Sequence, residues 1–273
     1  MPIIAITREM GSLGKDVAQG LGQALGLPVV YQELIDCLAD RMRVRKSHVI
    51  RLLDGSAGLF ERLTADKTSL SIFTAEEIYA LACKGGVIIR GWGATHLLRG
   101  VPHAVCVRVC APFETRKRRM MERLGADDEA RVAEEIRASD EAHAAIVRRN
   151  FGVQWSDPEH YDVVLNTQRV DVDECVDELL ALSRAPQFEE TGRARQVLED
   201  LALAARVRAA LRRAPETRDA RVQVGAQAGR VVLSGAGSTD EMLAFVEVAA
   251  AVPGVRDVVY RSNPGEELRP RLH

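Results

Sequence analysis

Short apolar runs alternate with longer amphipathic stretches along the first two thirds of the chain. The apolar runs are typical of buried strands and lie at residues 3–7, 87–89, 104–110 and 161–166. The amphipathic stretches predict helices at about residues 16–25, in several pieces over 33–84, over 113–149 and at 172–183. Because strands that alternate with helices build parallel sheets covered on both faces, the pattern predicts an α/β domain.

A second, smaller pattern follows a polar segment at residues 186–195, which we interpret as a linker. It predicts, in chain order, helix 196–213, strand 220–224, strand 229–235, helix 238–250 and a strand ending at Tyr260. Ser238 and Glu241 have the spacing of a capping box at the start of the second helix. This αββαβ order predicts a small α+β domain. The expected limits are residues 1–185 for the first domain, 196–264 for the second, and 265–273 for a tail.

Composition narrows the possible function classes. The 273 residues carry a net charge of −2, so no overall positive field favours nucleic acid or an anionic membrane, and we expect no nucleic-acid partner. The five cysteines are scattered and lack metal-site spacing, as expected for reduced thiols. The sequence shows no leader-like segment and no apolar run of the roughly 18 to 20 residues that a membrane helix needs. We therefore expect a cytoplasmic protein.

The segment from Ile3 to Asp16 has the layout of a phosphate-binding loop. An apolar strand leads into a glycine-containing turn that ends in Gly14-Lys15, where a helix begins. Backbone N–H groups of such a turn, beside the positive end of a helix, bind phosphate oxygens while the lysine reaches the outer ones. Against the pattern G-x-x-x-x-G-K-[ST], Glu9 replaces the first glycine and Asp16 replaces the hydroxyl residue. A plain strand-turn-helix connection with a solvent-exposed lysine is the alternative.

Further short motifs follow this loop in order along the chain. The loop itself is Thr7-Arg8-Glu9-Met10-Gly11-Ser12-Leu13-Gly14-Lys15-Asp16. The motifs that follow it are Glu33-Leu34-Ile35, Val87-Ile88-Ile89 with Gly91-Trp92-Gly93-Ala94, Ala111-Pro112-Phe113-Glu114-Thr115-Arg116, Trp155-Ser156-Asp157-Pro158 and Tyr161-Asp162-Val163-Val164-Leu165-Asn166-Thr167. On these motifs, residues 3–183 resemble the cytidylate kinase-like branch of the P-loop nucleoside monophosphate kinases. The resemblance implies a P-loop NTPase-type parallel sheet with helices on both faces. It also implies a kinase that uses ATP and Mg²⁺ to phosphorylate a nucleoside monophosphate, with CMP or dCMP as the expected acceptor.

The same resemblance implies roles for individual residues. Those expected to contact the phosphates of the donor nucleotide are Gly11, Ser12, Leu13, Gly14, Lys15 and Asp16, of which Asp16 would also hold the metal. The lid of such kinases supplies arginines, so the expected catalytic set is Lys15, Arg116, Arg119 and Arg148. The residues expected on the acceptor side are Glu33, Arg90 and Asp157. For each lid arginine, a solvated position on a charged helix is the alternative.

Departures from the family pattern lead to a second functional hypothesis. Gly91-Trp92-Gly93 stands in place of Gly-Arg-Gly, Tyr31 in place of an aspartate, and His143 in place of a lid arginine. Arg90, one residue before the first of these, offers a replacement cation. The alternative function is therefore a nucleotide-binding regulatory protein that has lost phosphoryl transfer. For His143 itself, an ordinary surface position on a helix is the alternative.

Two glycine-flanked segments characterise the C-terminal pattern. They are Gly229-Arg230-Val231-Val232-Leu233-Ser234-Gly235 and Val252-Pro253-Gly254-Val255-Arg256-Asp257-Val258. On these residues the segment 196–262 resembles a BON domain, which implies an accessory α+β module that binds protein or phospholipid. Packing on the first domain and self-association into a homo-oligomer are the alternatives.

Overall fold

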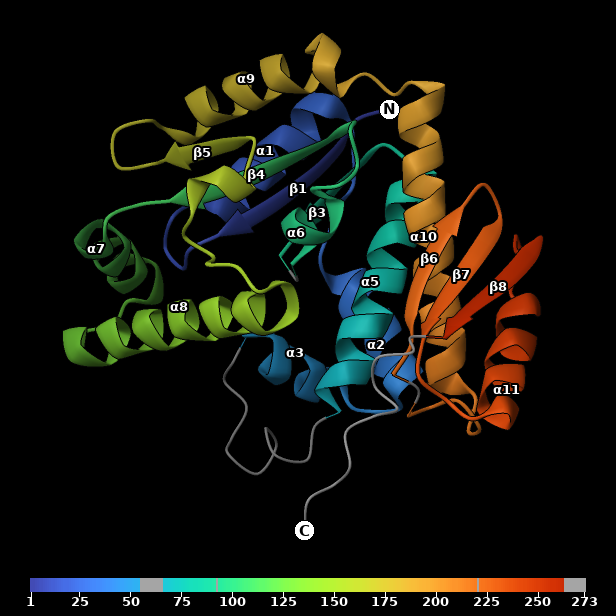
Figure 1. Ribbon diagram of the computed structural model, residues 1–273. Coiled ribbons are helices and arrows are strands. Elements are labelled where there is room, and N and C mark those ends of the chain that lie inside the picture. Colours follow the sequence, from blue (N-terminus) through green and yellow to red (C-terminus); the bar gives the residue numbers. More distant parts are fainter. Residues whose placement is uncertain (55–65, 92, 220, 263–273) are drawn as a thin grey trace. The chain divides into compact units, whose positions relative to one another are not determined.

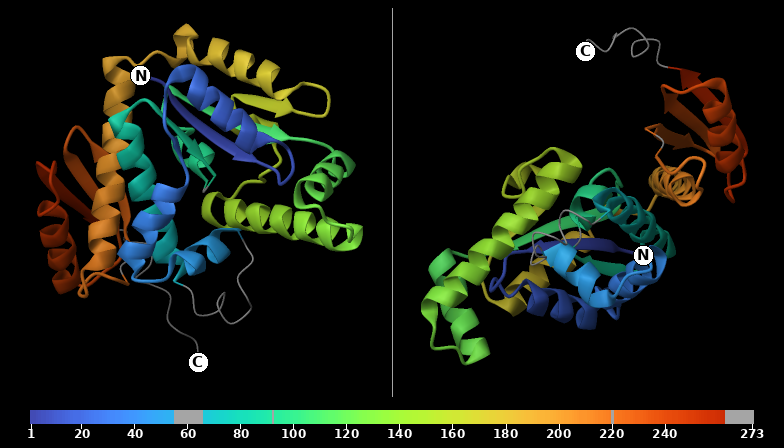
Figure 2. Two further views of the ribbon diagram at one scale, coloured as in Figure 1. Left: turned by 180° about the vertical axis from the view of Figure 1, so that it is seen from behind. Right: turned by 90° about the horizontal axis from the view of Figure 1, so that it is seen from below.

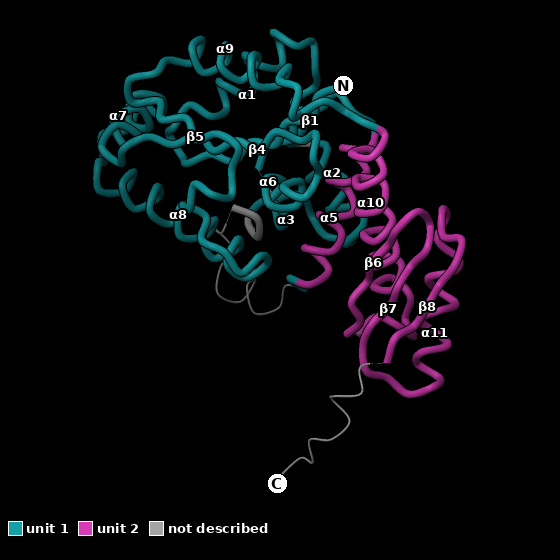
Figure 3. The backbone as a smooth tube through the Cα atoms, turned by 45° about the horizontal axis from the view of Figure 1, so that its top comes forward, with its two compact units in different colours: residues 1–67, 84–191 teal, residues 68–83, 192–273 magenta. Residues whose placement is uncertain are grey.

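The chain divides into two compact units (Figure 3). The computed structural model describes residues 1–54, 66–91, 93–219 and 221–262. The first unit comprises residues 1–67 and 84–191, and the second comprises residues 68–83 and 192–273. Trp92, Ala220 and the predicted tail at 265–273 lie outside the described residues.

The first unit is built on a five-stranded parallel sheet in the order β2-β3-β1-β4-β5 (Figure 1). Its strands are β1 (Ile3–Arg8), β2 (Val29–Val30), β3 (Val87–Arg90), β4 (Ala104–Cys110) and β5 (Val163–Asn166). Ile3 of the central strand lies opposite Val87 on one side and Ala104 on the other. The predicted parallel sheet is confirmed. The sequence pattern missed β2 because two residues are too few to form a recognisable apolar run.

Helices cover both faces of this sheet (Figures 1 and 2). In the first unit they are α1 (Gly14–Leu25), α2 (Gln32–Met42), α3 (Lys46–Asp54), α6 (Ala94–Leu98), α7 (Phe113–Leu124), α8 (Glu129–Phe151) and α9 (Val172–Ser183), with short 3₁₀ turns at Pro158–His160 and Pro186–Phe188. Val105 and Val107 belong to the core beneath α1 and α9. Cys106 points to the opposite face, where its thiol donates to the carbonyl of Thr95 in α6 at 3.2 Å.

The helical region predicted over residues 113–149 is divided into α7 and α8. The first helix ends at Gly125, whose φ of 58° is the left-handed conformation that glycine adopts most easily. The second begins at Asp128, whose side chain accepts a hydrogen bond from the Arg131 N–H at 3.0 Å. Both signals are local, and they allow α7 and α8 to pack against each other around Met120 and Ile136.

The second unit contains a three-stranded sheet in the order β6-β7-β8, with β6 antiparallel and β8 parallel to β7. Its elements are α5 (Lys67–Lys84), α10 (Gly192–Arg213), β6 (Gln223–Gln227), β7 (Arg230–Gly235), α11 (Thr239–Ala250) and β8 (Asp257–Ser262). Val207 of α10 and Phe245 of α11 pack on Val231 and Leu233. The predicted α+β order and the capping box of Ser238 are confirmed.

Two features of the second unit differ from the sequence pattern. Helix α10 begins at Gly192, inside the segment predicted as a linker. Helix α5, far away in sequence, also belongs to this unit, because Arg212 donates to the Ser69 hydroxyl at 2.7 Å and Arg213 pairs with Glu76. The domain limits 1–185 and 196–264 stay a prediction. No helix among the described residues has both the length and the apolar character that crossing a membrane requires.

Candidate functional site

The loop between β1 and α1 has a fixed backbone shape. The backbone N–H of Ser12 donates to the Glu9 carbonyl at 3.2 Å, and its hydroxyl donates to the carbonyls of Glu9 at 2.8 Å and Val109 at 3.1 Å. Gly11 has a φ of 80°, and a Cβ there would lie 2.7 Å from the carbonyl oxygen of Arg116. A side chain at position 11 therefore has neither the conformation nor the room that it needs.

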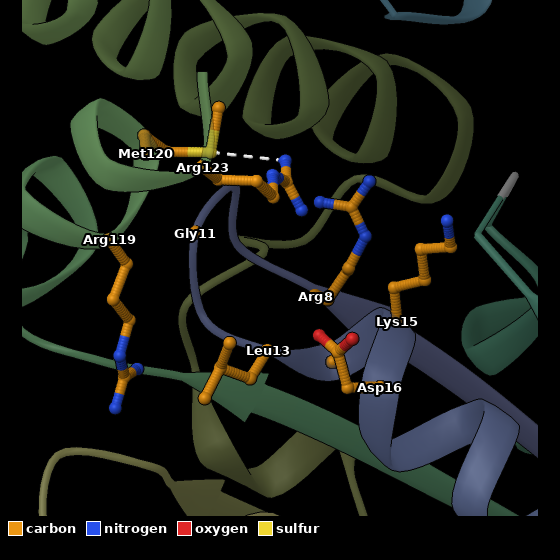
Figure 4. Close-up of a pocket in the computed structure, with 9 residues that line it drawn as sticks. Arg8, Gly11, Leu13, Lys15, Asp16, Arg119, Met120 and Arg123 are labelled. Atoms are coloured by element: carbon orange, nitrogen blue, oxygen red, sulfur yellow. Dashed lines mark hydrogen bonds between the residues drawn. The ribbon is translucent and has the colours of Figure 1, made fainter. Parts of the chain in front are cut away.

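A pocket of about 260 Å³ opens at this loop (Figure 4). Its lining residues are Arg8, Gly11, Leu13, Gly14, Lys15, Asp16, Arg119, Met120 and Arg123. Figure 4 shows the side chains of Arg8, Lys15 and Arg123 directed into the same region, whereas Arg119 points away from them. Four basic residues and one acid line the pocket, so its charge favours an anion.

The start of α1 adds backbone donors to these cations. Leu13 occupies the N-cap position in a left-handed conformation, with a φ of 62°, and makes no side-chain capping hydrogen bond. The N–H groups of the first helical turn have no partner within the helix, and the helix dipole makes this end positive. Gly14, Lys15 and Asp16 form that turn and line the pocket. The arrangement suits a phosphate group, as the loop pattern predicts.

The lid arginines predicted from the sequence lie in three different environments. Arg119 lines the pocket and donates to the Thr167 hydroxyl at 2.9 Å and carbonyl at 2.7 Å, and its burial lowers the pKa of its guanidinium. Arg116 is buried, does not line this pocket, and pairs with Asp140 at 2.8 Å. Arg148 lines a different pocket. Of the predicted catalytic set, the pocket at the loop between β1 and α1 therefore brings together Lys15 and Arg119.

Sequence reasoning left Arg8 out of the site and considered Arg123 only as a further lid arginine on the face of Arg119, although both line the pocket. Arg8 is the last residue of β1, and strand ends beside a phosphate loop are where a ligand binds in parallel sheets. Arg123 lies four residues after Arg119 on the same helix face. The location of Arg8 at a strand end and the spacing of Arg123 from Arg119 were the sequence signals that could have assigned both residues to the pocket.

A second pocket, of about 280 Å³, lies on the other side of Glu9. Its lining residues are Glu9, Arg108, Asp140, Glu141, Ala144, Arg148, Gln154, Trp155 and Ser156. Trp155 is held by a hydrogen bond from its indole N–H to the Thr7 hydroxyl at 3.0 Å, and the Arg108 guanidinium lies 4.3 Å from the indole centroid. His143 is half-buried and stacks on the same indole with a centroid distance of 5.1 Å. His143 thus lies half-buried on α8, with a contact to Trp155 that the sequence did not predict.

The predicted acceptor residues have different neighbours. Glu33 accepts a hydrogen bond from the Tyr31 N–H at 3.4 Å, and the Arg90 guanidinium lies 4.2 Å from the centre of the Tyr31 ring. Asp157, in contrast, lies beside Glu159 and His160, and the ligand atoms of these three residues are within 4.8 Å of one another. None of the three predicted acceptor residues lines either pocket.

His96 makes the stability of the first unit dependent on pH. Burial, followed by the charges of His160 and Arg108, lowers the pKa of His96 to about 4. The unfolded chain takes up this proton near pH 6.5, so its contribution to stability is complete above that pH and is lost as the pH falls towards 4. Allowing for its partial exposure, we expect a loss of about 2 kcal/mol that the His96→Gln variant does not show. Urea unfolding at pH 7 and pH 4.5 measures this difference, and an NMR titration of His96 with a pKa near 6.5 would contradict it.

Comparisons with known proteins match two successive segments of the chain. The sequence pattern of the cytidylate kinase-like family matches residues 3–169, and that of the BON domain matches residues 199–261. A cytidylate kinase of Methanothermobacter thermautotrophicus is 28% identical over 172 residues, which is 63% of this chain and 98% of that protein. The crystal structure of an uncharacterized protein from Eubacterium ventriosum superposes with a TM-score of 0.52 and 24% identity, over 68% of this chain and 99% of that one.

Proposed function

Because the chain belongs to the cytidylate kinase-like family, we propose that it transfers a phosphoryl group from ATP to a nucleoside monophosphate, with CMP or dCMP as the preferred acceptor. The observation that carries this proposal is the cationic pocket at the start of α1, which combines a glycine-dependent loop with Arg8, Lys15 and Arg123. Glycine at position 11 lets the loop pack closely against the Arg116 backbone, which keeps its N–H groups beside the pocket.

The residues of this pocket position the donor and balance its charge. ATP supplies the transferable phosphoryl group. Such a transfer needs little covalent help from the protein, but it needs alignment and positive charge where negative charge spreads. Backbone donors from Gly11 to Gly14 would hold the phosphates, and the Lys15 ammonium would reach their outer oxygens. Arg119 and Arg148 are the proposed lid cations.

The proposal also assigns residues to the acceptor nucleotide and a role to the second unit. Glu33 and Asp157 remain proposed acceptor residues on the strength of the motifs that contain them, and Arg90 as the replacement cation beside Gly91. The BON-like segment is proposed as an accessory module for protein or phospholipid. A cytoplasmic location and self-association stay predictions.

Asp16 gives the proposal a test that depends on metal. Its carboxylate lies in the first turn of α1 and lines the pocket, where it repels phosphate unless a cation lies between them. Mg²⁺ held by Asp16, directly or through water, would remove that repulsion. We therefore expect ATP affinity to depend on Mg²⁺ more steeply in the native protein than in Asp16→Ser. Calorimetry with and without Mg²⁺ measures this, and equal dependence in both proteins would mean that Asp16 only favours the start of the helix.

A coupled assay of ADP release across CMP, dCMP, UMP, AMP and GMP tests the function itself. Release that depends on CMP or dCMP supports the proposal. ATP binding without release for any acceptor supports the second candidate, a nucleotide-binding regulatory protein. The observation that favours this second candidate is Arg116, which pairs with Asp140 instead of lining the phosphate pocket.

A further inference from the structure

The carboxylate of Glu9 binds to groups that do not line the pocket of Lys15. One of its oxygens accepts a hydrogen bond from Arg108 at 2.7 Å. The other accepts from the Ala111 N–H at 3.1 Å and lies 3.4 Å from Nε of Arg116. Glu9 therefore occupies the place of the first loop glycine without facing the pocket of Lys15, which it does not line.

Arg116 connects this carboxylate to a distant helix. Its Nε donates to the Ala111 carbonyl at 3.0 Å, and one terminal nitrogen donates to the Met10 carbonyl at 3.3 Å. Both terminal nitrogens donate to the carboxylate of Asp140 on α8, at 3.2 and 2.8 Å. A single planar guanidinium thus touches the loop, the end of β4 and α8, a geometry that a lysine could not provide.

The charges in this group balance. Glu9 and Asp140 supply two negative charges, and Arg108 and Arg116 supply two positive ones. The side chains of both arginines are less than a tenth exposed, at 6% and 7%, and that of Glu9 is 15% exposed. Because buried charges need their partners, loss of any one carboxylate leaves an arginine under-compensated beside the loop.

We propose that Glu9, Arg116 and Asp140 form a positioning link that holds the phosphate-binding loop in shape from α8. Arg116 in this role acts on the nucleotide through the loop backbone, by fixing Met10 next to Gly11, and not by contact with phosphate. The effect of the link on nucleotide binding rests on the proposed function, whereas its effect on the loop does not.

Asp140 does not line the pocket of Lys15, so a substitution at Asp140 tests the link without changing a residue of that pocket. We expect Asp140→Asn to weaken ATP binding about five- to tenfold and to speed hydrogen exchange of the Ser12 amide by a similar factor. Asp140→Glu keeps the charge and is expected to restore most of both. The matched control on the same helix is Glu135→Gln, since Glu135 is exposed and pairs with Arg131 at 3.4 Å on the surface. Thermal unfolding of each variant shows whether it remains folded.

The measurements separate the link from the proposed function. If the native protein does not bind ATP, the kinase proposal fails. The hydrogen-exchange rate of the Ser12 amide in Asp140→Asn still shows whether the link holds the loop. If Ser12 exchanges at the native rate in folded Asp140→Asn, the link is wrong whatever the protein binds. A double variant of Glu9→Gln and Asp140→Asn adds a further check. Its loss should be smaller than the product of the single losses, because both act through Arg116, and independent losses would overturn the proposal.

Discussion

Replacing Lys15 by alanine is expected to weaken ATP binding or slow phosphoryl transfer by at least about tenfold, which corresponds to about 1.4 kcal/mol. The ammonium of Lys15 is directed into the pocket from the first turn of α1, beside Arg8 and Arg123 (Figure 4). A cation at this place opposes the charge of a polyphosphate where the helix end already supplies N–H donors. Alanine keeps the helix and removes the ammonium together with its aliphatic stem.

Calorimetric titration with ATP and Mg²⁺ measures the effect of Lys15→Ala on binding, and steady-state assays measure its effect on turnover. Lys46→Ala is the matched control, because Lys46 is more than half exposed, at 57%, and pairs with Asp36 at 2.8 Å, outside both pockets. Unchanged affinity and turnover in folded Lys15→Ala would remove the phosphate cradle from this loop. A similar loss of affinity or turnover in Lys46→Ala would show that the effect comes from the more negative net charge of the protein and not from the place of Lys15.

Replacing Arg108 by methionine is expected to lower the free energy of unfolding by about 3 kcal/mol or more. Arg108 lies on β4, where it pairs with Glu9 at 2.7 Å and donates to the Trp155 carbonyl at 3.0 Å. It also lies against the Trp155 indole. Methionine fills similar space but leaves the Glu9 carboxylate with one arginine fewer and the Trp155 carbonyl with one donor fewer. Removing one partner of a buried ion pair is strongly destabilising, because the remaining charge loses much of its compensation.

Urea unfolding followed by tryptophan fluorescence measures this loss. Arg118→Met is the matched control, since Arg118 is 70% exposed and its pair with Glu122 spans 3.9 Å on the surface, so a change within about 0.5 kcal/mol is expected. The double variant of Glu9→Gln and Arg108→Met removes both charges and should recover part of the loss. A native-like stability of Arg108→Met would contradict the role assigned to the buried charges.

The architecture and the strand-loop-helix layout of residues 3–25 could be predicted from the chain because their signals are local. Strands β1 and β4 are buried on both faces, so their residues are mostly apolar, with Arg108 as the exception within β4, and such runs indicate a parallel sheet. The loop is contiguous, and the positions of its glycines, Lys15 and Asp16 are set by the turn and the first turn of α1. The division of the predicted helical region is also local, because Gly125 is the C-cap of α7 and Asp128 is the N-cap of α8.

The roles of the charged side chains required the folded chain. Arg116 and Arg119 lie three residues apart on α7, but their partners come from remote segments. Arg116 pairs with Asp140, 24 residues later, and Arg119 binds Thr167, 48 residues later. Glu9, read as a substitute for a loop glycine, meets Arg108 across 99 residues. Periodicity specifies the direction of a side chain from its own helix or strand, whereas its ion pair depends on which other segment packs there, and packing of that kind is a property of the whole fold.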